Sequence, residues 1–138
     1  MILWFAVLCH LEEFLRQRVD VKVEQGYSQN EVLPEPPVVK VYRSREPDLE
    51  IWARPKGTLI MAMDIWENND DPDPKAANQL LATLEEKVQE ALKEWPKQAM
   101  ADLKIRITDI GFDDISGDGE NYRPQVAAFY KIRINWAK

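Results

Sequence analysis

The sequence predicts an α+β protein: one domain in which two main helices pack on an antiparallel or mixed β-sheet of about five to six strands. Three observations predict this class. The chain has 138 residues, the size of one ordinary domain, and 45% of them are hydrophobic, which is enough for a core. Two segments have the apolar period of a helix, and several others alternate apolar and polar residues as strands do. No repeat or long linker divides residues 1–138, so we expect a single domain that begins with an N-terminal helix over residues 1–18.

Two helices are expected. The first covers residues 3–18 and starts in the apolar run Met1–Cys9. This run is too short to cross a bilayer, which takes about 20 residues. It leaves open whether its side chains belong to the core or form a docking surface. The second helix is expected over residues 75–95, where Asp73 is a suitable N-cap and Pro96 ends the helix because proline lacks a backbone donor.

The alternation of apolar and polar residues predicts the strands. They are expected at residues 19–23, 38–42, 49–53, 58–66, 103–110 and 126–136. Both faces of the segment 58–66 are largely apolar, with Asp64 as the exception, so this strand is expected at the centre of the sheet with both faces covered. The last strand is long enough to pair with it along most of its length. Polar, proline-rich or acidic loops are expected at residues 28–37, 67–73 and 111–124.

The charge balance limits the possible partners. The net charge is −6 and the isoelectric point is about 4.9, so the surface repels phosphates and we expect no sequence-specific nucleic-acid binding. No apolar segment is long enough for a membrane helix, and we expect no membrane partner. The sequence has no P-loop, no dinucleotide-binding glycine motif and no C-x-x-C motif, so we expect no cofactor.

Cys9 and His10 are the only cysteine and the only histidine. Their proximity in sequence suggests a nucleophile and its base. Adjacent residues of a helix point about 100° apart, however, and Cys9 lies in an apolar run. We therefore interpret Cys9 as a packing residue. No serine lies in a nucleophile elbow, and the sequence predicts that the protein is not an enzyme.

Two groups of carboxylates could bind a metal ion, so a metal-dependent enzyme is an alternative function. Asp114 begins a D-x-S-x-D-G pattern that is typical of the start of an EF-hand loop, but Gln125 stands where the bidentate glutamate is needed. A looser divalent-ion site would use Asp113, Asp114 and Asp118. The second group would need a basic partner to hold Mg²⁺ for chemistry, and none is near it in the sequence. Its members are Asp64, Glu67, Asp70, Asp71 and Asp73. We interpret the first group as a solvated turn and the second as a solubilising helix N-terminus, where negative charge suits the helix dipole.

Several segments from about Val19 onward resemble one protein family in their order and pattern. They are VDVKVEQGY, LPEPPVVKVY, GTLIMAMDIW, AANQLLATLEEKVQEAL and VAAFYKIRINW. A helix and a strand precede a proline-bearing approach to a second strand. A long apolar strand, a helix with an apolar stripe and a strand with alternating aromatic residues follow. This order is similar to that of the phage tail terminator family, which includes the lambda minor tail protein U and related tail-completion proteins. The N-terminal apolar run departs from the family pattern.

The resemblance implies a structural protein of the virion tail, assembled in the host cytoplasm. It implies a homo-oligomeric ring, usually a hexamer, on the end of the tail tube. Such a ring stops tube polymerisation and provides the surface that joins the head. The implied partners are other copies of the chain, the tail tube protein and a head-completion or connector protein. The alternative function is a small adaptor or protein-binding module that docks through its apolar N-terminal helix.

A ring needs contacts between two different patches of each copy. Loops and hairpins that are stiffened by proline suit this role, because little entropy is lost on docking. We therefore expect the protein interface at the protruding loops. The candidate residues are Val32, Leu33, Pro36, Pro37, Arg45, Glu46, Pro47, Arg54, Pro55, Lys56, Asp113, Asp114, Asp118, Tyr122 and Arg123.

Overall fold

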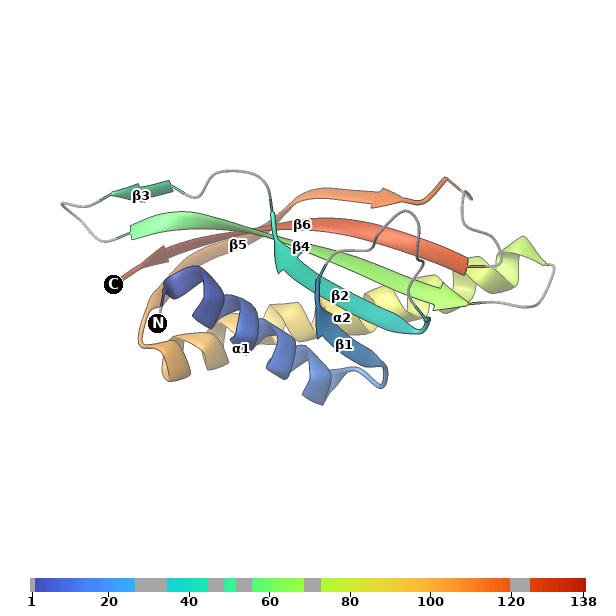
Figure 1. Cartoon of the computed structure of the whole chain (residues 1–138), viewed down its shortest axis with the longest axis horizontal. Coiled ribbons are helices and arrows are strands. Elements are labelled where there is room, and N and C mark those ends of the chain that lie inside the picture. The colour runs from blue at the N-terminus through green and yellow to red at the C-terminus, as the bar shows by residue number, and fades with distance from the viewer. Residues whose placement is uncertain (1, 27–34, 45–48, 52–55, 69–72, 120–124) are drawn as a thin grey trace.

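A computed structural model describes residues 2–26, 35–44, 49–51, 56–68, 73–119 and 125–138 of the chain (Figure 1). In these residues two helices pack on one face of a mixed six-stranded sheet, which confirms the predicted fold class. The helices are α1 (Leu3–Arg18) and α2 (Pro74–Leu103). The strands are β1 (Lys22–Gln25), β2 (Val38–Arg43), β3 (Leu49–Ile51), β4 (Lys56–Asn68), β5 (Arg106–Gly117) and β6 (Gln125–Ala137).

The sheet is built around β4 and β6. Its strand order is β1-β2-β4-β6-β5, and β3 pairs with the beginning of β4 off this path. β1 runs parallel to β2, while every other pair of neighbours is antiparallel. The pairing of β4 with β6 runs without interruption from Lys56 opposite Ala137 to Asn68 opposite Gln125. The predicted central position of β4 and its long pairing with the last strand are therefore confirmed, and β1 and β5 are the edges.

The main core fills the space between the sheet and the two helices. Its members from β4 and β6 include Leu59, Met61, Met63, Ile65, Tyr130, Ile132 and Ile134. The opposite face of β4 is also covered, because Trp66 is buried with Val38 and Ala127 in a second, smaller cluster. Burial on both faces confirms the expectation for this strand, since a strand covered on both sides has few polar positions.

Helix α2 does not end at Pro96, as the sequence predicted, but continues for two further turns. A proline inside a helix costs about 3 kcal/mol, because it removes a backbone hydrogen bond and crowds the preceding turn. Tertiary packing offsets this cost, since Trp95 and Ala99 are fully buried in the main core. Lys104 ends the helix in the left-handed conformation, with φ of 56° and its N–H donating to the Met100 carbonyl. The next strand therefore begins later than predicted.

The segment predicted as a long acidic loop, 111–124, is a strand as far as Gly117. β5 pairs with β6 along its length, with irregularities between Ile107 and Asp109 and between Phe112 and Asp114. The polar side chains of this segment predict a loop. A strand is held by backbone hydrogen bonds, however, and these form with polar side chains as well as with apolar ones. An edge strand also tolerates charged residues well. The predicted loop at 67–73 likewise starts later, since β4 includes its first two residues.

Candidate protein-binding surface

The outer backbone of β5 is free in the described part of the chain. The strand pairs only with β6, and no described residue bonds to its N–H or C=O groups on the side away from β6. The opposite edge of the sheet is partly blocked, because Arg16 of α1 donates from Nη2 to the Val23 carbonyl of β1 at 3.2 Å. A long strand with unpaired backbone groups is a template for pairing with another chain.

Two large apolar side chains are exposed on β5: Phe112 at 43% and Ile115 at 48%. They lie on the helix side of the sheet, because they stand opposite Ile132 and Tyr130 of β6. The Phe112 ring meets the Tyr130 ring edge-on, with 5.5 Å between the centroids. We call Phe112 and Ile115 the β5 patch. Its exposure means that the helical layer covers the sheet only as far as Tyr130.

Side chains of α2 hold Tyr130 in place beside the β5 patch. The Tyr130 hydroxyl donates to Glu85 Oε1 at 2.6 Å and accepts from Gln89 Nε2 at 2.7 Å. Burial raises the pKa of Tyr130 to about 12, and the neighbouring Glu85 carboxylate contributes to the rise. The ring that supports Phe112 is thus held by packing and by two hydrogen bonds, so the β5 patch is a preformed surface.

Aspartates accompany the β5 patch. Arg133 of β6 forms ion pairs with Asp113 and, at 3.7 Å, with Asp109. Asp114 is exposed and has no ion-pair partner among the described residues. The β5 edge therefore has free backbone groups, with the apolar β5 patch on the helix side of the sheet and the aspartates on the other side.

The predicted interface residues are only partly brought together. Pro36 and Pro37 precede β2, Lys56 is exposed at the start of β4, and Asp118 directly follows β5, where it accepts from the Ala127 N–H at 3.2 Å. Asp118 and Lys56 lie at opposite ends of the long strands. The three predicted aspartates share β5 and its end, whereas the two prolines and the lysine do not join them. The other candidates, outside the described residues, are Val32, Leu33, Arg45, Glu46, Pro47, Arg54, Pro55, Tyr122 and Arg123.

A second apolar surface lies at the start of α1. Most of the N-terminal apolar run belongs to the core, as the full burial of Val7 illustrates, but Ile2 is 64% exposed and Phe5 is 36% exposed. Trp4 stacks on Phe5 with 5.7 Å between the ring centroids, and the guanidinium of Arg43 from β2 lies 4.5 Å from the centre of the Trp4 ring. We call Ile2, Trp4 and Phe5 the α1 patch. The run is therefore both core and surface.

Cys9 and His10 do not form a nucleophile–base pair. Trp95 Nε1 donates to His10 Nδ1 at 3.0 Å, so the ring hydrogen is on Nε2, which lies 2.8 Å from Asp102 Oδ2. The hydrogen bond with His10 holds the pKa of Asp102 below its ordinary value. Both ring nitrogens are occupied, and Cys9 Sγ instead accepts from Gln25 Nε2 at 3.4 Å. This arrangement links α1 to the end of α2, and Cys9 is half-buried outside the main core.

The two carboxylate groups do not form a metal site in the described part of the chain, where no three His, Cys, Asp or Glu side chains are placed to hold an ion. Asp64 is buried and accepts from the Tyr42 hydroxyl at 2.9 Å. Burial, together with this carboxylate, raises the pKa of Tyr42 well above its ordinary value. Asp73 caps α2 as predicted, by accepting a backbone N–H of the first turn at 3.0 Å. Asp70 and Asp71 lie outside the described residues.

A groove of about 520 Å³ lies between the first half of α2 and the neighbouring strands. Val21, Leu80 and Leu84 contribute apolar lining, and Glu67 and Lys87 contribute the two charged groups. Burial raises the pKa of Glu67. One carboxylate and one amine do not supply a nucleophile together with an acid and a base.

Sequence reasoning missed the β5 patch, and it left open whether the run that contains the α1 patch is core or a docking surface. The β5 patch stands among aspartates and glycines, and the two β-bulges interrupt the period of two that would reveal a strand. The α1 patch lies in a run in which Val7 and Leu8 are buried and the other described members outside the patch are half-buried, so the run alone does not show which side chains remain exposed. The signal available for Phe112 and Ile115 was the recurrence of single apolar residues within an acidic segment.

The sequence matches no family model and no curated protein. No helix in the described ranges is long and apolar enough to cross a membrane.

Proposed function

We propose that the chain is a structural protein of the phage tail terminator kind, which assembles from several copies into a ring, with six as the expected number. In this proposal the ring lies on the end of the tail tube, stops its polymerisation and provides the surface that joins the head. One observation supports an assembly role most directly: β5 is a sheet edge with free backbone groups and an exposed apolar patch. Such an edge favours contact with another protein chain.

The side-chain chemistry also favours a structural role over a catalytic one. His10 is the only histidine of the chain, and its ring is engaged by Trp95 and Asp102. Among the described residues, the buried carboxylate of Asp64 accepts a hydrogen bond from the Tyr42 hydroxyl and belongs to no group of three or more metal-ligating side chains. A catalytic centre needs an acid, a base or a nucleophile held together in reach of one substrate atom.

The partners in this proposal are other copies of the chain, the tail tube protein and a head-completion or connector protein. The acidic balance, with a net charge of −6, fits a component that lets DNA pass without binding it. The protein would be assembled in the host cytoplasm and remain in the virion tail.

The test is a tube-length assay. A tail tube protein from the same genome is polymerised with and without this chain, and tube lengths are measured by negative-stain electron microscopy. We expect shorter tubes with a ring at one end, and light scattering should give the number of copies in the ring. An unchanged length distribution, with no density added at the tube ends, would contradict the proposal.

The α1 patch supports a second function, that of a small adaptor that binds a partner through its N-terminal helix. In that case Phe5→Ser should weaken partner binding and leave the melting temperature unchanged, because Phe5 is already exposed. Deleting residues 1–9 is a poor test, since Val7 is fully buried and its loss would unfold the protein. A stable monomer that never shortens tubes would favour this function.

A further inference from the structure

We infer that the β5 patch of one copy binds the α1 patch of the next copy. The inference rests on the proposed self-assembly and names the two surfaces that meet. The described residues include five exposed large apolar side chains, and four of them belong to these two patches; the fifth is Leu80 of α2. Apolar surface of this kind is stabilised by leaving water, so each patch favours an apolar partner.

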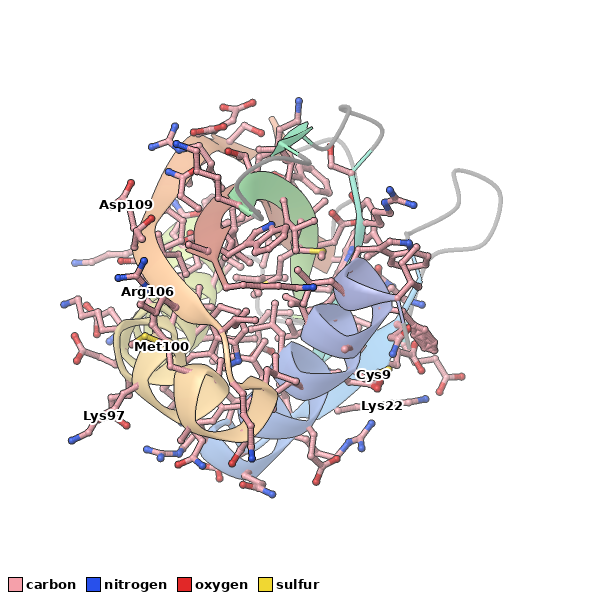
Figure 2. The ribbon with its side chains drawn as sticks, turned by 90° about the vertical axis from the view of Figure 1, so that its left-hand side faces the viewer. Cys9, Lys22, Lys97, Met100, Arg106 and Asp109 are labelled. Atoms are coloured by element: carbon pink, nitrogen blue, oxygen red, sulfur yellow. The ribbon has the colours of Figure 1, made fainter. Side chains whose placement is uncertain are left out.

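The two patches lie on opposite sides of the molecule. α1 packs beside β1 and β2, whereas β5 is the edge at the other end of the strand order. Figure 2 shows α1 with Cys9 on one side and β5 with Arg106 and Asp109 on the other. A contact between different patches on opposite sides is heterologous, so each copy still offers one free patch after it has bound a neighbour. Repeated with a rotation that closes, the contact produces a ring.

The β5 patch is a surface on which a helix can pack. The helical layer ends at Tyr130, whose hydroxyl is held by Glu85 and Gln89, and beyond it the β5 patch is exposed. Ile2 and Phe5 are three positions apart at the start of α1, so they lie on the same side of the helix. The first turn of α1 from a neighbouring copy would therefore continue the helical layer across β5.

The aspartates of β5 lie on the other face of the sheet from the β5 patch. Asp113 pairs with Arg133 and Asp114 stands opposite Lys131, and both of these β6 residues alternate with the core residues of their strand. The helix side of β5 therefore presents apolar side chains without these carboxylates. Two β5 edges paired with each other would bring the aspartates of both copies together, which is unfavourable, whereas a helix packed on the helix side of β5 would not. This favours α1 against β5 over two β5 edges against each other.

Two double variants test the inference by removing one patch each: Ile2→Ser with Phe5→Ser, and Phe112→Ser with Ile115→Ser. Sedimentation velocity and native mass spectrometry then give the oligomeric state of each variant and of their mixture. Each variant alone should lose the wild-type oligomer. An equal mixture should form a one-to-one heterodimer that grows no further, because only one intact α1 patch and one intact β5 patch can meet. The matched control is Leu80→Ser, which removes an equally exposed side chain outside both patches and should keep the wild-type oligomer.

Three outcomes would overturn the inference. These are wild-type assembly by either double variant, a mixture that stays monomeric, and a wild-type protein that is monomeric up to about 1 mM, where even a weak contact forms. The tube-length assay separates these outcomes from the proposed function, because it measures tube termination whichever surfaces the copies use. Thermal melts confirm that the variants are folded. If loss of the Phe112 contact with Tyr130 unfolds the second variant, Ile115→Asp alone takes its place.

Discussion

Replacing Tyr130 by phenylalanine should destabilise the protein by about 1.5–2 kcal/mol. The substitution keeps the buried ring and its edge-on contact with Phe112 but removes the hydroxyl that Glu85 and Gln89 engage. A hydrogen bond to a charged group contributes about 1.5–3 kcal/mol and one between neutral groups about 1 kcal/mol. Glu85 and Gln89 are half-buried, so water replaces part of the loss, and the expected destabilisation falls below the combined range of about 2.5–4 kcal/mol.

The corresponding fall in melting temperature is about 5–7 °C, because unfolding entropy is about 2.1 cal/mol/K per residue in a chain of 138 residues. The pH dependence has a definite sign. Folding raises the pKa of Tyr130 from 10.0 to about 12, so this contribution is present below pH 10 and is lost as the pH rises through 12. The gap in stability between wild type and Tyr130→Phe should therefore narrow between those two values.

Urea unfolding at pH 7 and at several alkaline values measures both effects. Adding Glu85→Gln gives a double-mutant cycle, in which the combined loss should be smaller than the two separate losses together, because the residues share one hydrogen bond. The reasoning would be refuted if Tyr130→Phe stayed within about 0.3 kcal/mol of wild type at pH 7, which is within the additivity of unrelated sites. It would also be refuted if the free energy of unfolding fell equally steeply with pH in the wild type and in Tyr130→Phe at alkaline pH.

Three further predictions concern the helix–helix link, the β1–β2 surface and the cysteine. Trp95→Phe keeps an aromatic core residue but removes the Nε1 donor to His10, so chemical denaturation should show a loss of about 1 kcal/mol; no loss would mean that the bond is not formed in solution. Lys40 lies 2.9 Å from Glu24 and holds the pKa of that carboxyl below its ordinary 4.5, so the pair stabilises the fold above this pH and its contribution is lost as the pH falls through the folded-state pKa. Lys40→Met should lower the free energy of unfolding by about 0.5 kcal/mol at pH 7 and make the loss of stability at acid pH less steep. If the wild type and the variant lost stability equally steeply at acid pH, the Lys40–Glu24 pair would not contribute to that loss. Cys9→Ser should change stability by less than about 0.5 kcal/mol and leave the oligomer intact, and a changed oligomer would place Cys9 in an interface.

The elements with strong periodicity could be predicted from the sequence. α1 has the predicted bounds, and the apolar stripe predicted the body of α2. The dense apolar run of β4 predicted a strand covered on both faces, because a residue pattern reports directly on how many faces are buried. The alternation in β6 predicted a strand long enough to pair along β4, which it does.

The errors have a common origin in contacts made far along the chain. Pro96 is a valid stop signal for an isolated helix, but Trp95 and Ala99 are packed on the core and hold the following turns in place. The segment after Gly111 has the composition of a loop, yet β6 lies beside it and its backbone forms a strand. Local preference amounts to at most a few kcal/mol, and tertiary packing of buried side chains exceeds it.

The candidate surface was only half predictable. Asp113, Asp114 and Asp118 were expected at an interface because they were predicted to lie in a protruding loop, whereas the structure places the first two on the edge strand β5 and the third directly after it. Phe112 and Ile115 could not be assigned as exposed, since apolar side chains are ordinarily counted with the core. Their exposure depends on where the helical layer ends, which is set by α2 and Tyr130 rather than by their own neighbours in sequence.

By itself, the sequence determined the class of fold, the central strand, the long last strand and the two helices, because each is encoded by a repeating pattern within a single segment. The tertiary structure alone decided which strand became the free edge, which apolar side chains stayed in water and which groups engaged His10. These features arise from segments distant in the chain: β5 is an edge because no other strand of the described ranges pairs with its outer side, and His10 is held by residues of α2. Exposure and pairing are properties of the packed molecule, and a local residue pattern does not contain them.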